Sequence, residues 1–344
     1  MHMTGNAKAI KRYRVALESG SHLSPDDAEA LFHALREERD VDALASLLRA
    51  WLRKGYSVDE IAACAAVLRR EVRRVECSHD VFVDVVGTGG SKTKTFNVST
   101  AAAFVAAGAG LPVAKHGNRA ASSRTGSADA LSELGVSLDS DADSASRSLS
   151  REGICFMFAP NFHNLTKELA AARRMVGLPT IFNLLGPVAN PASAPFQLIG
   201  IWDGAKAPTY GAALSRLGTT RSWIVHGKDG LDEITLDGAT EVTEVTDHGV
   251  ESFEISPSDF GVAESGTDEL RAETPGKSAE LVRRVLSGLE RGAARDLVAI
   301  NAAAALYLSG KAASLKDGRD LAEESIDSGA ADTKLKALAG ETGE

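Results

Sequence analysis

The stretch VFVDVVGTGG at residues 81–90 constrains the fold more than any other, because an apolar, β-branched run passes directly into glycines. Such a run without polar alternation is typical of a strand buried on both faces, as in a parallel sheet. The segment TAAAFVAAGAG that follows, residues 100–110, predicts a buried helix. A strand, a glycine turn and a helix in this order predict an α/β domain that begins near Val81.

Strands and helices continue to alternate through the rest of the chain. Apolar runs ending in glycine or proline predict strands at residues 111–117, 153–160, 196–204 and 221–230, and residues 239–256 predict antiparallel hairpins. Helical spacing predicts helices at residues 127–135 and 208–218 and a helical tail from Ser278 to Leu338. The predicted fold class is therefore α/β with a mostly parallel central sheet.

A different pattern precedes the sheet. From Leu23 to Glu76 the apolar residues recur at helical spacing, as in VDALASLLRAWLRKG. Ser24, Asp40 and Ser57 stand where helices of this region should begin, and their side chains can accept hydrogen bonds from the first turn. The sequence predicts a compact helical domain in front of the α/β domain.

Composition limits the partners that this chain can have. It has 344 residues, of which 44% are hydrophobic and 25% charged, as in a globular protein with a sizeable core. A formal net charge of -9 argues against a nucleic-acid or anionic-membrane surface, but a small anionic substrate still fits a local basic pocket. Cys64, Cys77 and Cys155 lack metal-binding or redox spacing, so reduced thiols are expected. No stretch approaches the roughly 20 apolar residues of a membrane span, and no signal peptide precedes the helices, so we expect a cytoplasmic protein.

The glycine turn is the first candidate site. Gly87, Gly89 and Gly90 let backbone N–H groups approach an anion closely, and the helix start near Ser99 adds its positive dipole end. The pattern is neither a P-loop nor a dinucleotide fingerprint, and a simple tight turn between strand and helix is the alternative. Hydroxyl side chains favour a phosphate site, because several can donate to phosphate oxygens at once. These hydroxyls belong to Thr88, Ser91, Thr93, Thr95, Ser99 and Thr100.

A second polar loop, KHGNRAASSRTGSAD at residues 115–129, follows the next predicted strand. Open α/β sheets bind ligands at the carboxyl ends of their strands, so the two loops should lie side by side. Together they indicate a sugar phosphate with more than one phosphate, whereas alone the second loop could be a solvated basic loop. Its candidate binding residues are Lys115, His116, Asn118, Arg119, Ser122, Ser123, Arg124 and Ser127.

Two further segments carry candidate groups. In VHGKDGLDEIT, the acidic side chains of Asp229, Asp232 and Glu233 follow a predicted strand. Adjacent carboxylates beside phosphates suit Mg²⁺, and an exposed acidic turn is the alternative. His163 and Arg173 can face one cleft, the first as an imidazole wall and the second as a fork for a carboxylate. A structural histidine and a solvated arginine are the alternative for that pair.

Four long motifs stand in one order along the chain: GTGG with TFNVSTAAAFVAAGAG, VAKHGNRAASSRTGSADALSELG, RRMVGLPTIFNLLGPVANPA and VHGKDGLDE. Their order and spacing closely resemble the anthranilate phosphoribosyltransferase family, from the N-terminal helices to the last helix. The resemblance implies transfer of the 5-phosphoribosyl group from 5-phosphoribosyl diphosphate to the amine of anthranilate in tryptophan biosynthesis, with Mg²⁺ as cofactor and pyrophosphate released. It also implies a small N-terminal helical domain hinged to a larger α/β domain of the nucleoside phosphorylase/phosphoribosyltransferase type, and a homodimer formed through the helical domains.

Domain boundaries and site residues also follow from the resemblance. The helical domain would comprise residues 1–78 with a returning helical segment at about 168–188, and the α/β domain residues 79–167 and 189–344. No single acid or base is expected, because the aromatic amine is nucleophilic when neutral. The expected donor-binding residues are Gly87, Thr88, Gly89, Gly90, Ser91, Thr95, Asn97, Ser99, Thr100, Lys115 and Ser127. The expected acceptor-binding residues are Gly87, His116, Asn118, His163 and Arg173, and the expected magnesium ligands are Ser99, Asp232 and Glu233.

The chain departs from the family pattern at two places. The family commonly has an acidic residue and a glycine after GTGG, where this chain has Ser91 and Lys92, so a second magnesium contact is in question. The family often shows Pro-Ala-Met after the histidine that matches His163, where residues 164–166 read Asn-Leu-Thr. This second change leaves the choice of acceptor in question.

Three other functions stay open from the sequence. A phosphoribosyltransferase for a different aromatic acceptor is consistent with the change at residues 164–166. A pyrimidine nucleoside phosphorylase shares the fold, but GTGGSKTKTFNVST does not reproduce the lysine-serine loop of those enzymes. A noncatalytic relative that binds nucleic acid should have a basic groove and a degraded metal pair, whereas this chain is acidic and keeps Asp232 and Glu233.

Overall fold

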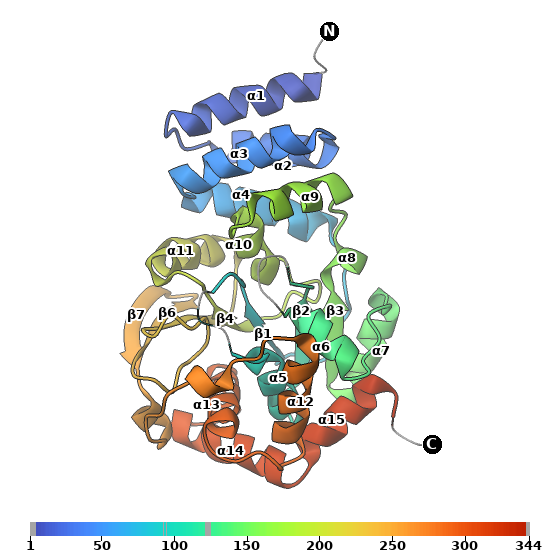
Figure 1. Ribbon diagram of the computed structural model, residues 1–344, viewed down its shortest axis with the longest axis vertical. Coiled ribbons are helices and arrows are strands. Elements are labelled where there is room, and N and C mark those ends of the chain that lie inside the picture. The colour runs from blue at the N-terminus through green and yellow to red at the C-terminus, as the bar shows by residue number, and fades with distance from the viewer. Residues whose placement is uncertain (1–4, 92, 94, 121–124, 342–344) are drawn as a thin grey trace.

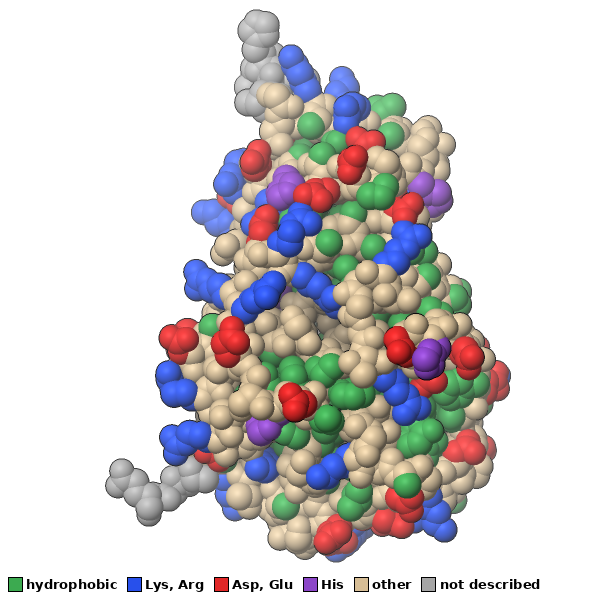
Figure 2. Space-filling view, turned by 180° about the vertical axis from the view of Figure 1, so that it is seen from behind, with side chains coloured by type: hydrophobic (Ala, Val, Ile, Leu, Met, Phe, Trp, Pro, Cys, Tyr) green, Lys and Arg blue, Asp and Glu red, His purple; other side chains and the backbone are tan. Residues whose placement is uncertain are grey.

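The computed structural model describes residues 5–91, 93, 95–120 and 125–341. A layer of helices forms one end of the molecule, and a sheet covered by helices forms the other (Figure 1). The predicted fold class, an N-terminal helical domain with an α/β domain around a mostly parallel sheet, is confirmed. On the face seen in Figure 2, acidic and basic side chains are interspersed over both ends. No helix in the described ranges combines the length and apolar character that a membrane crossing requires.

Capped helices form the N-terminal end. Ser24 accepts a hydrogen bond from the first turn of its helix, Asp40 accepts two, and Ser57 forms a capping box with Glu60, as the sequence predicts. Leucines, alanines and the fully buried Trp51 pack between the helices. The helices are α1 (Gly5–Glu18), α2 (Pro25–Glu37), α3 (Val41–Lys54) and α4 (Val58–Glu71).

The described residues form one seven-stranded sheet of order β3-β2-β1-β4-β5-β6-β7. The strands from β3 to β5 are parallel, and β6 and β7 add an antiparallel hairpin, as predicted. Because β1 has β2 on one side and β4 on the other, the strand order reverses at β1, where α/β sheets bind ligands. The strands are β1 (Val83–Gly87), β2 (Val113–Gly117), β3 (Ile154–Phe158), β4 (Phe196–Gly200), β5 (Arg221–Gly227), β6 (Thr240–Thr246) and β7 (Gly249–Ile255).

Helices cover the sheet and bury its apolar residues. Helix α5 (Val98–Gly108) is buried along nearly its whole length and packs on α13 (Ala293–Leu308). A Cβ on Gly108 would overlap Ser325 of α14, so glycine is required for this close packing. The other helices of this domain are α6 (Ser127–Glu133), α7 (Ala142–Glu152), α8 (Ala159–Phe162), α11 (Ala207–Leu217), α12 (Pro275–Leu286), α14 (Leu315–Asp327) and α15 (Ala330–Ala339), with short 3₁₀ turns at Gly204–Lys206, Pro257–Phe260 and Asp268–Leu270.

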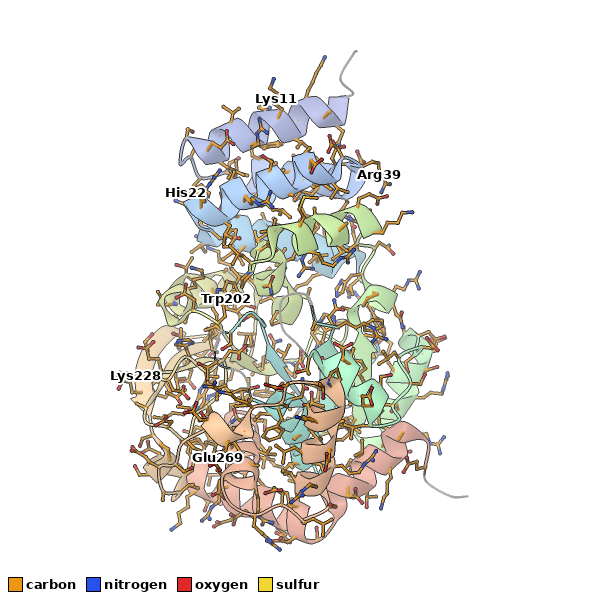
Figure 3. All side chains as sticks on the ribbon, in the orientation of Figure 1. Lys11, His22, Arg39, Trp202, Lys228 and Glu269 are labelled. Atoms are coloured by element: carbon orange, nitrogen blue, oxygen red, sulfur yellow. The ribbon has the colours of Figure 1, made fainter. Side chains whose placement is uncertain are left out.

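A segment after β3 returns to the helical end. It contains α9 (Lys167–Val176), which packs on α3, and α10 (Ile181–Val188), which packs on α4. Arg39, labelled in Figure 3, pairs with Glu168 of α9 at 3.1 Å. One apolar cluster runs from the N-terminal helices through this segment to the sheet. The predicted domain boundaries stay a prediction, because that cluster crosses them.

Candidate active site

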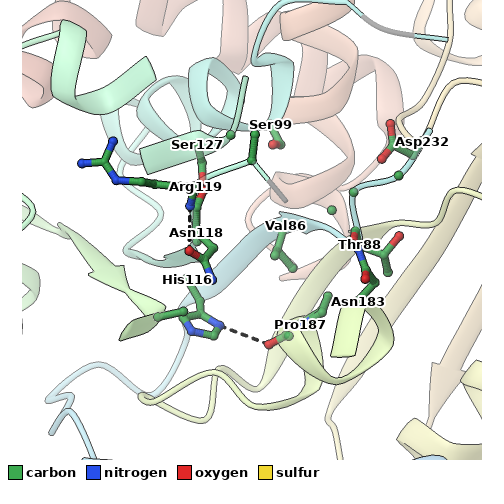
Figure 4. Close-up of a pocket in the computed structure, with 18 of the residues that line it drawn as sticks. Val86, Thr88, Ser99, His116, Asn118, Arg119, Ser127, Asn183, Pro187 and Asp232 are labelled. Atoms are coloured by element: carbon green, nitrogen blue, oxygen red, sulfur yellow. Dashed lines mark hydrogen bonds between the residues drawn. The ribbon is translucent and has the colours of Figure 1, made fainter. Parts of the chain in front are cut away.

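A cavity of about 410 Å³ lies at the carboxyl ends of the parallel strands. Its volume falls within the range of about 300–1,000 Å³ that is usual for small-molecule sites. Figure 4 shows Asn118, Arg119 and Ser127 on the side opposite to Thr88 and Asp232. Except for Thr100, every residue expected to bind the donor, the acceptor or magnesium lines it: Gly87, Thr88, Gly89, Gly90, Ser91, Thr95, Asn97, Ser99, Lys115, His116, Asn118, Ser127, His163, Arg173, Asp232 and Glu233. Asp229, the third candidate of the acidic turn, does not line it.

Thr100 is the one residue of the expected donor site that lies away from the cavity. Its side chain is fully buried and does not line the cavity, although the preceding Ser99 does. Successive residues of a helix point about 100° apart, so the start of α5 turns Ser99 to the cavity and Thr100 to the core. Lys92 and the candidate residues 122–124 lie outside the described residues.

The glycine loop after β1 exposes backbone donors. Gly89 and Gly90 have φ values of +64° and +93°, in the left-handed region that glycine adopts without strain. A Cβ on Gly90 would overlap Pro179, just before α10. Within the described part of the chain, the N–H groups of Gly89 and Gly90 make no hydrogen bond to protein. They are therefore candidate donors to an anion.

Two hydroxyls of this loop are hydrogen-bonded to protein. Thr88 donates its hydroxyl to the carbonyl of Gly200 at 3.0 Å and accepts from the N–H of Trp202 at 3.3 Å. Thr95 donates to the carbonyl of Phe96 at 3.1 Å. These two hydroxyl protons are engaged with protein, so the arrangement favours backbone N–H groups as the phosphate donors.

Three buried polar side chains, Asp84, Lys115 and Asn190, lie between β1 and β2 and form the floor network, of which Lys115 lines the cavity. The two strands pair only at Val83 and Val113, so the backbone groups beyond that pair need other partners. Lys115 Nζ donates to the carbonyl of Val85 at 2.6 Å, and Asp84 Oδ1 accepts from the N–H of His116 at 3.2 Å. These contacts let the strands diverge, which opens the sheet where the cavity begins.

Asn190 completes this floor. Its Nδ2 donates to Asp84 Oδ2 at 2.7 Å and to the carbonyl of Ala114 at 2.9 Å. Burial raises the pKa of Asp84 to about 7, and the charge of Lys115 opposes that shift. Burial also lowers the pKa of Lys115, which the charges of Asp84 and Glu233 oppose. The floor is thus a buried polar network whose members depend on one another.

A pair of histidines forms another wall. His116 Nδ1 lies 3.1 Å from the carbonyl of Gly186, which can only accept, so this nitrogen carries the hydrogen (Figure 4). The Nε2 atoms of His116 and His163 are 3.2 Å apart, so His163 donates to His116. Burial lowers the pKa of His116 to about 3, with a further lowering by His163, and burial lowers the pKa of His163 to about 4. Both rings are neutral at neutral pH.

This pair predicts a pH dependence of stability. The unfolded chain binds protons on these rings near the usual pKa of about 6.5, whereas the folded protein excludes them, so stability is lost as pH falls. Between about pH 7.5 and pH 5 we expect the two rings to cost about 2 kcal/mol each. Urea unfolding of the parent and of the His116→Gln/His163→Gln variant should show this part of the decline only in the parent. His248→Gln, at a side chain that is 90% exposed, is the control. Equal declines in the parent and the double variant would contradict the assignment.

Arg173 presents a positive charge to the cavity from the last turn of α9. Its guanidinium lies 5.3 Å from the centre of the Phe182 ring. Burial lowers the pKa of Arg173 to about 10, so it remains charged. No carboxylate of the described residues lies within ion-pair distance of it. A partly buried guanidinium beside an aromatic ring suits a planar carboxylate.

Leu165 and Thr166, where the chain departs from the family pattern, have separate roles in the structure. Thr166 is the N-cap of α9 and accepts from the N–H of Leu169 at 3.2 Å. Leu165 lines the cavity and adds an apolar surface near Phe182 and Leu185, which also line it. The cap explains Thr166 by local structure alone.

The acidic turn after β5 is held from behind by a helix. Asn301 of α13 accepts from the N–H of Ile234 at 3.0 Å and donates to its carbonyl at 2.9 Å. Burial and the neighbouring Asp232 raise the pKa of Glu233 to about 8, while Lys115 and hydrogen bonds from Ser99 oppose this. A cation would remove the mutual repulsion of the two carboxylates.

These residues fit Mg²⁺ together with a phosphate ligand. Mg²⁺ commonly takes one or two carboxylates and completes its shell with water and substrate phosphates. Across the described ranges, no group of three or more His, Cys, Asp or Glu side chains could hold a metal ion. The pair Asp232 and Glu233 would therefore need oxygen atoms from a ligand or water.

The site predicted from the sequence does not include three asparagines that the structure brings to the site or its supports, Asn183, Asn190 and Asn301. Asn183 of α10 lines the cavity and donates to the carbonyl of Thr88 at 3.0 Å. Asn190 and Asn301 are buried and hold the floor and the acidic turn. A polar residue in an apolar stretch, as in TIFNLLG and LVAINAAAA, was the available signal. That signal indicates a buried hydrogen bond but does not identify its partner.

Comparison with known proteins identifies the family. A model of the glycosyl transferase family, a/b domain, matches residues 79–332. The chain is 46% identical to the anthranilate phosphoribosyltransferase of Moorella thermoacetica, with 93% of this chain and 94% of that protein covered. It is 45% identical to the corresponding protein of Pelotomaculum thermopropionicum, with 97% of each covered. The chain belongs to the anthranilate phosphoribosyltransferase family.

Solved structures of the anthranilate phosphoribosyltransferase family have the same fold. The protein from Thermus thermophilus has a TM-score of 0.86 and 37% identity, with 97% of this chain and 98% of that chain covered. The protein from Saccharomyces cerevisiae in complex with PRPP and Mg has a TM-score of 0.87 and 29% identity, with 99% of each chain covered. The family and the fold predicted from the motifs are confirmed.

Proposed function

We propose that this protein transfers the 5-phosphoribosyl group of 5-phosphoribosyl diphosphate to the amine of anthranilate in tryptophan biosynthesis. The products are N-(5-phosphoribosyl)anthranilate and pyrophosphate. The observation that carries the proposal is Arg173, a charged guanidinium that lines the same cavity as the glycine loop and has no carboxylate partner in the described residues. The family names and the neighbouring structure with PRPP and Mg support it, as does one from Saccharomyces cerevisiae with 4-fluoroanthranilate.

The two substrates take opposite parts of the cavity in this proposal. The diphosphate lies on the N–H groups of Gly89 and Gly90 and at the N-terminus of α5, where backbone donors and the helix dipole favour an anion. Anthranilate lies by Arg173, which binds its carboxylate, and by the imidazoles. The remaining donor-side residues are Gly87, Thr88, Ser91, Thr95, Asn97, Ser99, Lys115 and Ser127, and Asn118 and Gly87 complete the acceptor side.

Catalysis then rests on positioning and charge. The bond from C1 of the ribose to the diphosphate oxygen breaks with its electron pair on pyrophosphate, and the amine nitrogen forms the new bond to C1. The proton that the amine loses leaves to the pyrophosphate or to water. The backbone donors of the loop stabilise the leaving group, and Arg173 holds the amine in line with C1, an arrangement that can lower the barrier by several kcal/mol.

Mg²⁺ is the proposed cofactor. Asp232, Glu233 and Ser99 would hold it, and when bound it neutralises charge on the diphosphate. We also propose a cytoplasmic enzyme that acts as a homodimer through its helical domain. Val15 of α1 is 54% exposed there, which is consistent with an apolar contact on that side.

Replacement of Arg173 tests the acceptor assignment. Arg173→Ala should raise the KM for anthranilate by roughly ten- to a hundred-fold, as expected for the loss of a charge-assisted pair, and leave donor affinity nearly unchanged. Arg173→Lys should restore only part of the affinity for anthranilate, because an ammonium group cannot form the planar fork. Steady-state kinetics with each substrate varied measures both effects.

Aniline, which lacks the carboxylate, is the matched control. It should be a poor acceptor for the parent and lose little more in Arg173→Ala, because the interaction is already absent. Values of kcat/KM for both acceptors in both proteins complete the cycle. Additive losses would show that Arg173 does not bind the carboxylate.

The acidic pair provides the test of the magnesium site. Asp232→Asn with Glu233→Gln should abolish the Mg²⁺-dependent part of donor affinity and raise stability slightly, because the mutual repulsion disappears. Calorimetric titration of 5-phosphoribosyl diphosphate with and without Mg²⁺ measures it. Asp268→Asn with Glu269→Gln changes an exposed acidic pair outside the cavity and is the control. If Asp232→Asn with Glu233→Gln bound the donor with parent-like affinity at limiting Mg²⁺, the segment that carries these two residues would be only an acidic turn.

A further inference from the structure

Two hydroxyls join the glycine loop to the acidic turn. Ser91 is buried, and its Oγ lies 2.8 Å from the carbonyl oxygen of Gly230 and 2.7 Å from that of Thr93. Its single proton can be donated to either carbonyl. Thr93 donates its own hydroxyl to the carbonyl of Asp229 at 3.0 Å. The donor side and the metal side of the proposed site are thus in direct contact.

The acidic turn has its own supports. Asp229 Oδ1 accepts from the N–H of Leu231 at 3.1 Å, and Asp229 Oδ2 accepts from the hydroxyl of Thr235 at 2.8 Å. The N–H of Gly227 donates to the carbonyl of Leu231 at 2.8 Å. The turn is therefore a fixed body against which the loop is placed.

The glycine loop has few supports of its own. From Gly89 to Thr95, the described residues hydrogen-bond to other segments only through the hydroxyls of Ser91 and Thr93. The segments also approach closely, because a Cβ on Gly230 would lie 3.2 Å from Thr93 Oγ1, and its φ of +88° favours glycine. Among the described residues of the loop, these two hydroxyls make the hydrogen bonds that join it to the turn.

We propose that Ser91 and Thr93 are positioning residues, a hydroxyl clamp that fixes the spacing between the donor loop and the acidic pair before ligands bind. The inference rests on the proposed function. Ser91 stands where the family commonly has an acidic residue, and in this chain its side chain binds the turn that carries Asp232 and Glu233. Because the clamp already holds the donor loop and the acidic turn at the spacing needed for binding, less conformational entropy is lost when the diphosphate and Mg²⁺ bind. The clamp therefore strengthens donor binding.

Removal of both hydroxyls tests the clamp. Ser91→Ala with Thr93→Val should weaken binding of 5-phosphoribosyl diphosphate in the presence of Mg²⁺ by roughly tenfold, the expected scale for two neutral hydrogen bonds. The KM for anthranilate should change less than about twofold, since the acceptor side has no part in the clamp. Thr93→Ser, which keeps the hydroxyl, should bind the donor like the parent in the same calorimetric titration. Thr333→Val removes a hydroxyl bonded to the carbonyl of Gly329 at 3.0 Å, in α15 and outside the cavity, and is the matched control.

Hydrogen exchange provides a readout without ligand. In the double variant the amides of Thr88 and Phe96, which flank the loop and donate to the carbonyls of Gly200 and Leu270, should exchange faster than in the parent, and those of the acidic turn and of α13 should not. Parent-like donor affinity in the double variant, or equal losses for donor and anthranilate, would overturn the clamp. If the parent itself binds no 5-phosphoribosyl diphosphate, the proposed function is wrong, and the double variant can then show no effect on donor affinity. Unchanged hydrogen exchange in the double variant would overturn the clamp independently of the proposed function.

Discussion

Gly89→Val is expected to eliminate detectable turnover, with a loss of more than about a hundredfold in donor affinity, while the protein remains folded. Gly89 has a φ of +64°, a conformation that costs an L residue roughly 1–2 kcal/mol. No atom of the described residues, apart from its chain neighbours, lies within 4 Å of the Cβ position, so the added side chain would enter open space in the donor part of the cavity. The valine would therefore displace the ligand rather than the core. Calorimetry with 5-phosphoribosyl diphosphate and Mg²⁺ measures the loss.

Gly20→Val is the matched control for this experiment. Gly20 lies between α1 and α2 and has a φ of +82°, and in the described ranges no atom beyond its chain neighbours lies within 4 Å of its Cβ position. The variant should show the same backbone strain in thermal unfolding and keep parent-like donor affinity. Retained donor binding in folded Gly89→Val would remove the glycine loop from the donor site.

Asp84→Ala should have the largest effect on stability, a decrease of about 3–5 kcal/mol in the free energy of unfolding. The change leaves the buried Lys115 without its nearest compensating carboxylate and removes the acceptor of the His116 N–H and the Asn190 amide. Urea unfolding at neutral pH measures it. Asp141→Ala removes an exposed N-cap of α7 and should cost only about 1 kcal/mol. Equal costs would mean that the floor network does not hold β1 and β2.

Local patterns predicted the sheet and the helix starts well. The run into glycine at residues 81–90 identified β1 and its turn because apolar strands and φ-positive glycines are determined by nearby sequence. The sequence predicts Ser24, Asp40 and Ser57 as helix caps for the same reason, and the structure has all three. Each of these features involves residues only a few positions apart.

Long-range partners could not be predicted from the sequence. The hydroxyl of Thr88 bonds to Gly200 and that of Thr93 to Asp229, and nothing in the spacing of the hydroxyls indicates these carbonyls. The motif placed Ser99 and Thr100 together, but the turn of α5 separates them into cavity and core. Such roles depend on side-chain direction and on segments distant in the chain.

The most direct test of the central claim is the consumption of anthranilate by the purified protein. With 5-phosphoribosyl diphosphate and Mg²⁺ present, the fluorescence of anthranilate should fall as anthranilate is consumed. Pyrophosphate should appear in an amount equal to the anthranilate consumed. Omission of the diphosphate donor should abolish both changes. No loss of anthranilate, in a preparation that binds the donor by calorimetry and consumes another aromatic amine, would contradict the account and assign the enzyme to a different acceptor.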